Sequence, residues 1–423
     1  NQFIFDNLDI QRLLKRACKR FDGGYVMGGL IGHGDAFVIR DPNGIRPAYW
    51  YEDDEVVAMA SERPAIQTAL TVSVKYVREL KPGHALIIKR DGTVSEVPFV
   101  DQPSERKACS FERIYFSRGT DRDIYLERKK LGEQLVEPVL QSVNYDFENT
   151  VFSYVPNTSE SAFFGFIEGL QKSIDAYKKK KLLDLKDQLT DEKINEIMNW
   201  RPRIEKLVVK DEKLRTFIAD EEIRAEMVSY VYDVTYGIVR NKIDTLVLID
   251  DSIVRGTTLR NSILRNLARL KPKKIIIISS CPQIRYPDCY GIDMSKMSEF
   301  VAFQALVELL RKNNKAYLLD ETYQRCKMQE KVPKEDVINE VKALYKEFTP
   351  EEISAEIARI VKPIDLDVEI EVIYQGLEGL HAACPNHTGD WYFSGDYPTP
   401  GGNKVANRAF TNYMEKINER AYA

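Results

Sequence analysis

Two adjacent carboxylates, Asp250 and Asp251, end an apolar strand-like stretch in the segment LVLIDDSIVRGTTL, residues 246–259. Paired acids at the end of a buried strand repel one another, so we expect a cation or hydroxyl groups to lie against them. Neighbouring carboxylates can also accept hydrogen bonds from a vicinal diol and help to hold Mg²⁺. The pair is therefore a candidate for binding a polyhydroxylated ligand or a metal ion.

The residues that follow the acids have the composition of a phosphate site. Gly256 precedes the pattern of a helix, and a helix N-terminus after such a loop presents free N–H groups and a positive dipole end. The hydroxyls of Ser252, Thr257 and Thr258 add donors. Together with the acids they suit a sugar 5-phosphate whose 2- and 3-hydroxyls meet the carboxylates. A helix-capping Asp with a solvated neighbour is the alternative, and it would be favoured for a bare acid pair.

Strands and helices alternate around this segment from about residue 110. We expect strands at 112–116, 146–155, 244–250 and 273–280, separated by helices at 127–143, 159–184 and 257–270. Such alternation predicts parallel βαβ units in an α/β fold, with ligand sites at the carboxyl ends of the strands. The Lys-, Asp- and Leu-rich stretch 170–200 is interpreted as a helical excursion on the surface.

The flanking parts of the chain have different patterns. Residues 24–99 are β-rich with turn signals at Asn43-Gly44, Pro82-Gly83 and Asp91-Gly92, and a polar connector follows near residue 105. Further helices are expected at 302–314, 333–348 and 350–361, before an aromatic, turn-rich tail. We therefore predict three units, covering 1–105, 106–348 and 349–423.

Composition excludes several classes of protein. The 423 residues include 43% hydrophobic and 30% charged residues, which is typical of a globular protein. The net charge of −4 argues against nucleic acid as a partner. No apolar run is long enough to span a membrane, so no membrane partner is expected. Six scattered cysteines favour reduced thiols and a cytoplasmic location over a disulfide framework.

Four co-linear motifs carry a resemblance to a known family. VLIDDSIVRGTT resembles the phosphoribosyl-pyrophosphate (PRPP) motif of type I phosphoribosyltransferases, and more narrowly that of the amidophosphoribosyltransferases. IYFSR at 114–118 and PQIRYPDCYGIDM at 282–294 are similar to further motifs of that family. GHGDAFVIRDPNGIRPAYW and KPGHALII resemble the later half of its glutamine amidotransferase domain. The resemblance covers about 20–120 and 240–302.

The resemblance implies a fold and an activity. The fold would be a type I phosphoribosyltransferase fold, a parallel sheet flanked by helices, preceded by a partial α+β amidotransferase domain of the Ntn-hydrolase type. The activity would be the first committed step of purine (IMP) biosynthesis, in which PRPP and glutamine or ammonia give phosphoribosylamine and pyrophosphate. The family is homo-oligomeric and is inhibited by purine nucleotides. The alternative is a catalytically silent, PRPP-binding regulatory protein.

The resemblance also assigns roles to residues. Asp250 and Asp251 would bind the ribose hydroxyls with Mg²⁺ nearby, and Ser252, Arg255, Gly256, Thr257 and Thr258 would surround the 5-phosphate. A second phosphate loop is expected at SYVPNTSES, residues 153–161, where Asn157 and Ser159 would bind pyrophosphate and Thr158 would face the metal. An ordinary helix N-cap is the alternative for that loop.

A closing loop is expected at residues 209–224, where Lys210, Lys213 and Arg215 are the candidates for contacting substrate. Lys210 and Arg215 would be the catalytic pair. The residues after Arg215 are more acidic than the basic run that the resemblance leads us to expect, and this keeps the silent alternative open.

Glutamine hydrolysis in this family uses an N-terminal cysteine. This chain begins at Asn1, and Cys18 falls within an apparent helix. We therefore expect residues 1–105 to be the later half of a truncated amidotransferase domain that does not hydrolyse glutamine. Some relatives carry an iron–sulfur cluster, but Cys109, Cys289 and Cys384 with His387 make only a weak metal signal.

Overall fold

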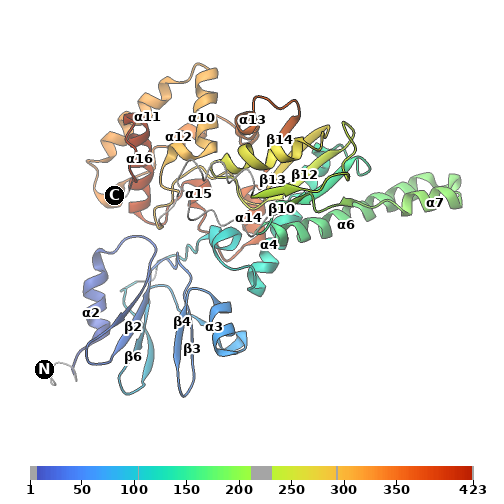
Figure 1. Cartoon of the computed structure of the whole chain (residues 1–423). Helices are drawn as coiled ribbons and strands as arrows, with labels where there is room; N and C mark the ends of the chain where they lie inside the picture. Colours follow the sequence, from blue (N-terminus) through green and yellow to red (C-terminus); the bar gives the residue numbers. More distant parts are fainter. Residues whose placement is uncertain (1–6, 103, 211–230, 292–293, 422–423) are drawn as a thin grey trace.

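The computed structural model describes residues 7–102, 104–210, 231–291 and 294–421, and the side chain of Asp187 is also outside the description. Figure 1 shows a smaller β-rich unit, drawn in blue, below a larger α/β unit from which a green helical arm projects. We call these the N-terminal unit and the C-terminal unit. The three-way division predicted from the sequence remains a prediction.

The N-terminal unit contains two antiparallel sheets. The first has the order β1-β2-β6-β7 and the second the order β4-β3-β5. Their strands are β1 (Val26–Leu30), β2 (Ala36–Arg40), β3 (Tyr49–Glu52), β4 (Val57–Ala60), β5 (Arg78–Glu79), β6 (His84–Ile88) and β7 (Val94–Pro98). Two helices accompany them, α2 (Ile10–Ala17) and α3 (Arg63–Leu70). The predicted β-rich character is confirmed, and Gly44, Gly83 and Gly92 take positive φ at the three predicted turns.

The C-terminal unit is built on a five-stranded parallel sheet with the order β14-β13-β12-β8-β9. Its strands are β8 (Thr150–Tyr154), β9 (Arg203–Ile204), β12 (Thr245–Asp250), β13 (Lys274–Ser279) and β14 (Glu369–Tyr374). Because β12 is central and pairs with both β8 and β13, the carboxyl ends of these three strands meet at one edge. The predicted α/β fold with a parallel sheet is confirmed.

Helices cover both faces of this sheet. One face packs against α5 (Val136–Ser142) and α6 (Glu160–Leu185) through a buried apolar cluster, and α4 (Arg122–Gln134) packs against α6. The helices α4 and α6 approach closely at two glycines, since a Cβ on Gly132 would lie 1.8 Å from the Ala162 carbonyl oxygen. A Cβ on Gly165 would lie 1.8 Å from the Lys129 carbonyl oxygen. The opposite face packs against α9 (Leu264–Ala268), α10 (Val301–Lys312) and α13 (Pro350–Val361).

The predicted excursion at 170–200 forms the projecting arm. α6 continues past the sheet and α7 (Asp191–Met198) folds back beside it (Figure 1). The rings of Tyr177 and Trp200 stack with centroids 5.5 Å apart and close the base of this hairpin. The arm therefore has an apolar contact of its own. Its lysines at 179–181 are exposed, as expected for a solvated face, whereas Lys178 is buried and donates to the Met198 carbonyl at 3.2 Å.

Two predicted elements are wrong. Residues 112–116 form a helical turn, η3 (Glu112–Phe116), because Phe111 and Ile114 are buried at helical spacing whereas Tyr115 and Phe116 are exposed. The helix expected at 333–348 is reduced to the short η8 (Lys334–Asp336) and α12 (Lys342–Tyr345). There the N–H groups of Ile338 and Glu340 donate to side chains of neighbouring helices instead of to their own turn.

The remaining helices are α11 (Tyr317–Gln329), α14 (Leu377–Ala383), α15 (Trp391–Ser394) and α16 (Pro400–Glu415). Strand β14 was not foreseen, because residues 349–423 were expected to be helical and turn-rich. Among the described residues, no helix combines the length and the apolar character needed to cross a membrane.

Candidate functional site

The acid pair lies at the carboxyl end of the central strand. Asp250 is the last residue of β12, and Asp251 opens the loop that leads to the helix at 257. The backbone N–H of Asp251 donates to Asp250 Oδ1 at 2.9 Å, and Ser252 Oγ donates to Asp251 Oδ1 at 3.2 Å. Gly256 has φ +71, a left-handed conformation that favours glycine, and turns the loop into the helix.

The second predicted phosphate loop lies directly beside the first. The Val155 N–H donates to the Ile249 carbonyl at 2.8 Å, which continues the β8–β12 pairing into the two loops. The Thr158 hydroxyl lowers the pKa of Asp251, and both residues line one cavity. The sequence therefore brings together two loops that are separated by about ninety residues.

The pKa values of both acids are raised. Burial is the main cause for Asp250, followed by the charge of Asp251. Burial also raises the pKa of Asp251, while the hydroxyls of Ser252 and Thr158 and the charge of Arg128 act in the opposite direction. The Ser252 hydroxyl thus contacts Asp251, and the charge of the buried Arg128 acts on the same carboxylate. These groups offset the negative charge of the two acids only in part, so the site favours a cation.

These loops surround a cavity of about 380 Å³, which we call the acid-pair cavity. Most of the predicted ligand-binding residues line it, namely Asn157, Thr158, Lys210, Asp250, Asp251, Ser252, Arg255, Gly256, Thr257 and Thr258. Arg255 Nε also donates to Glu299 Oε2 at 2.7 Å. Ser159 does not line it. Its side chain is buried and its hydroxyl donates to the Val155 carbonyl.

The expected closing loop begins at the cavity wall. Lys210 ends β10 (Val208–Lys210), which pairs antiparallel with β11 (Tyr232–Val234). Lys213 and Arg215 lie outside the described residues, so their predicted roles remain predictions.

Comparisons with known proteins agree on one family. A protein named amidophosphoribosyltransferase from Pasteurella multocida is 27% identical over 321 residues, which are 74% of this chain and 56% of the relative. The Bacillus subtilis protein of the same name is 29% identical over 305 residues, 70% of this chain and 54% of the relative. The chain is thus similar to proteins named amidophosphoribosyltransferase. It spans about half the length of these curated relatives, and no family model matches it.

Solved structures support the same fold. The glutamine PRPP amidotransferase of B. subtilis, solved with ADP and GMP, has a TM-score of 0.60 and 23% identity. The alignment covers 93% of this chain and 68% of that structure. A second structure, described as the allosteric regulatory enzyme of purine biosynthesis, gives the same TM-score and identity. The fold expected from the resemblance to amidophosphoribosyltransferases is thus confirmed.

Sequence reasoning missed the aromatic wall of the acid-pair cavity. Tyr115 and Phe116 from η3 line it together with Phe111, which precedes η3, and Tyr232 from β11. Burial and the charges of both acids raise the pKa of Tyr232 to about 12. The aromatic residues of FERIYF, within and beside a motif shared with amidophosphoribosyltransferases, were the available signal, but they had been assigned to a strand.

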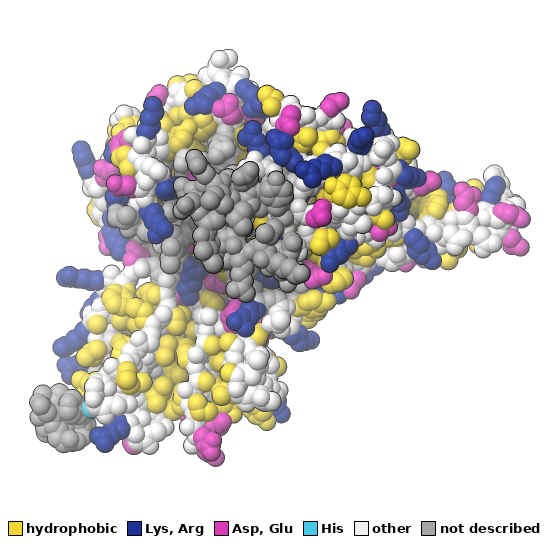
Figure 2. Space-filling view, in the orientation of Figure 1, with side chains coloured by type: hydrophobic (Ala, Val, Ile, Leu, Met, Phe, Trp, Pro, Cys, Tyr) yellow, Lys and Arg dark blue, Asp and Glu magenta, His cyan; other side chains and the backbone are white. Residues whose placement is uncertain are grey.

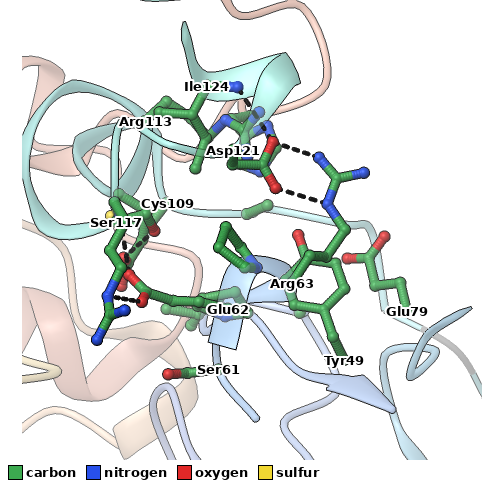
Figure 3. A pocket seen from close by; sticks show the side chains of 18 of the residues that line it. Tyr49, Ser61, Glu62, Arg63, Glu79, Cys109, Arg113, Ser117, Asp121 and Ile124 are labelled. Atoms are coloured by element: carbon green, nitrogen blue, oxygen red, sulfur yellow. Dashed lines mark hydrogen bonds and ion pairs between the residues drawn. The ribbon is translucent and has the colours of Figure 1, made fainter. Parts of the chain in front are cut away.

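A second, much smaller pocket lies where the two units meet, and Figure 3 shows the side chains that line it. Arg63 from α3 donates to Asp121 at 2.7 Å and to Asp123 at 2.7 Å. Burial alone would raise the pKa of Asp121, but the hydrogen bonds and charge of Arg63 outweigh it and lower that pKa. The cavity of about 10 Å³ has room for at most one water molecule. This pocket therefore joins the units and leaves no room for a substrate.

The weak metal signal at Cys384-x-x-His387 borders this junction. Burial and the neighbouring arginines lower the pKa of His387 to about 3. Among the described residues, no group of three or more His, Cys, Asp and Glu side chains is placed to hold a metal ion.

Proposed function

We propose that this chain is an amidophosphoribosyltransferase, which transfers the ribose 5-phosphate of PRPP to ammonia and releases pyrophosphate. The product, phosphoribosylamine, would begin the purine (IMP) pathway. One observation carries the proposal: the acid pair, the Gly256-Thr257-Thr258 loop and the Asn157-Thr158 loop line one cavity. The relatives reported above bear the name of this enzyme, which lends no support to a catalytically silent alternative.

The cavity offers a distinct partner to each part of PRPP. We assign the ribose 2- and 3-hydroxyls to Asp250 and Asp251, since carboxylates accept hydrogen bonds from a diol. The 5-phosphate would meet the N–H groups and hydroxyls at the helix start, which favour anions. The diphosphate would lie against Asn157 and Thr158, beside Lys210.

Magnesium fits the same donors. Mg²⁺ prefers oxygen ligands and is usually held by one or two carboxylates, with water and substrate phosphate completing the shell. Asp250, Asp251 and the Thr158 hydroxyl supply that kind of donor. When bound, the ion would neutralise charge on the departing diphosphate.

The residues of the chain would act by positioning and by electrostatics. The bond between ribose C1 and the diphosphate oxygen breaks through an oxocarbenium-like state, and ammonia then forms the new C–N bond at C1. Lys210, and Arg215 from the expected closing loop, would stabilise the negative charge that develops on the leaving group. The aromatic wall would exclude water, which competes with ammonia for C1.

We propose ammonia as the direct nitrogen donor for this chain. All six cysteines lie in the described part of the chain, and each is buried or half-buried. Burial raises the pKa of every one of these thiols, including Cys18. A thiol with a raised pKa is a poor nucleophile at neutral pH, so these cysteines are unsuited to attack glutamine. By resemblance to the family, we also propose a cytoplasmic homo-oligomer that purine nucleotides inhibit.

The test is pyrophosphate release from PRPP with Mg²⁺, with an ammonium salt or glutamine as the nitrogen source. Release with ammonium and none with glutamine is the expected result. Binding of PRPP without release from either source would refute transfer activity and favour the silent alternative. Equal release with glutamine would refute the proposal about the nitrogen donor.

A further inference from the structure

A groove of about 670 Å³ lies on a different surface of the C-terminal unit, between α10, α13, α16 and the helix that follows β12. We call it the basic groove. Four cationic side chains and one acidic side chain line it, namely Arg260, Arg311, Arg359, Lys362 and Glu308. Figure 2 shows Lys and Arg side chains gathered over the part of the molecule where Figure 1 draws the helix after β12. The lining of the groove thus carries more positive than negative charge.

Two of these cations are not neutralised by the rest of the described chain. Arg311 pairs with Glu308 at 2.9 Å, and Arg359 pairs with the buried Glu356. Within the described residues, the side chains of Arg260 and Lys362 have no hydrogen-bond or ion-pair partner. Arg260 is exposed and Lys362 is half-buried. Cations that gather without acids repel one another, and a bound anion would remove that repulsion.

The groove also has an apolar side. Phe303 and Val307 of α10 are buried beneath it. Tyr413 of α16 packs edge-on against Phe303 with ring centroids 4.8 Å apart, and it lines the groove with the half-buried Ile360. A ligand that combines charged groups with a flat apolar part would therefore find a partner for each.

We propose that the basic groove binds a small organic diphosphate, with its phosphates on Arg260, Arg359 and Lys362 and its apolar part on Tyr413 and Ile360. Among the described residues, the walls of this groove and of the acid-pair cavity have no member in common. The site is thus additional to the one assigned to PRPP. The proposal does not depend on the function proposed above.

The groove lies behind the loop that carries the phosphate-binding residues. A Cβ on Gly256 would lie 2.8 Å from Val361 Cγ1, so this loop packs against the end of α13 next to Lys362. The Val301 N–H at the start of α10 donates to the Val254 carbonyl at 2.9 Å. Arg260 itself lies one turn after Gly256, whose carbonyl accepts from the Arg260 N–H. A ligand in the groove is therefore expected to slow amide exchange in residues 254–258.

The test is calorimetric titration of the full chain with ADP as the diphosphate probe and adenosine as its uncharged counterpart, without Mg²⁺ or PRPP. ADP is expected to bind and adenosine is not. Arg260→Ala and Lys362→Ala should each weaken ADP binding at least fivefold. Arg269→Ala is the matched control, because Arg269 is an exposed cation directly after the same helical segment and does not line the groove.

Hydrogen exchange of the backbone amides, measured with and without ADP, locates the site. Slower exchange in residues 301–311 and 359–364 is expected in the wild type, and the Arg260→Ala variant should lose this change. Absence of ADP binding, equal binding by Arg260→Ala and the wild type, or slower exchange confined to 250–258 would overturn the proposal. Pyrophosphate release plays no part in these measurements, so a failure of the proposed activity would leave their outcome unaffected.

Discussion

Replacing Asp250 with asparagine is expected to stabilise the empty protein and to weaken its binding of Mg²⁺ with PRPP. Both acids are half-buried, and each lies at the end of a strand or the start of a loop that the sheet holds in place. Asparagine keeps an oxygen that can accept the Asp251 N–H, so the local turn should survive. The substitution therefore removes charge with little change of shape.

The size of each effect follows from ordinary electrostatics. Two unit charges about 6 Å apart repel by roughly 3 kcal/mol at an effective dielectric of about 20. Partial protonation of the pair and the nearby Arg128 reduce this, so we expect the variant to be more stable by about 1 kcal/mol at pH 7. Loss of a charged hydrogen-bond partner costs roughly 1.5–3 kcal/mol of binding, which is about a ten- to hundredfold loss of affinity.

The assay is urea unfolding at several pH values, with calorimetric titration of PRPP in the presence of Mg²⁺. Because the pKa of Asp250 is raised in the folded state, the folded protein holds a proton that the unfolded chain releases near pH 4. The stability of the wild type should therefore fall as the pH rises from about 4 through the raised pKa. The variant should show less of this decline.

Asp367→Asn is the control for a general charge effect, because Asp367 is exposed in the loop before β14. It should change neither the pH dependence nor PRPP affinity. Asp251→Asn should stabilise less than Asp250→Asn, since it also removes the favourable effect of the Arg128 charge on Asp251. A less stable Asp250→Asn protein that binds PRPP with unchanged affinity would refute both the repulsion and the ribose assignment.

Three other substitutions probe the same cavity. Thr158→Val removes a hydroxyl from the wall of the cavity and should weaken PRPP binding by about 1 kcal/mol. Calorimetry should find that Thr158→Ser binds like the wild type. Gly256→Ala would add a Cβ 2.8 Å from Val361 Cγ1 at a position with positive φ. Urea unfolding should therefore show a free energy of unfolding that is lower by about 1–3 kcal/mol. Lys210→Ala should lower the rate of pyrophosphate release roughly tenfold or more with unchanged stability, because Lys210 is exposed; an unaffected rate would remove it from the leaving-group site.

The acid-pair loop could be predicted from the sequence because its signals are local. An apolar run gives the strand, Gly256 marks the turn, and the two threonines mark the helix start. The parallel sheet then places this loop beside the one at 155–158, since both follow neighbouring strands. The order of the strands in the sheet thus places two motifs that are far apart in the sequence around one cavity.

Other features depend on tertiary contacts that local patterns do not contain. Arg128 comes from the middle of α4, where an arginine suggests only a solvated helix face, yet it is buried and donates to the Ser117 carbonyl at 2.7 Å. The helical turn at 112–116 also buries Glu112 and Arg113, which form ion pairs with Arg46 and Glu127. Such partners lie far apart in sequence, so no periodicity reveals them.

The charge balance of the acid-pair cavity explains why the proposed reaction needs further positive charge. Its described walls carry two carboxylates, Lys210 and Arg255, and Arg255 is already paired with Glu299. PRPP brings several negative charges, so these walls alone would bind it weakly. The missing charge must come from Mg²⁺ or from cations such as Lys213 and Arg215 of the expected closing loop. PRPP affinity should therefore depend steeply on Mg²⁺ concentration, and a chain that bound PRPP equally well in EDTA would show that the carboxylates serve the ribose alone.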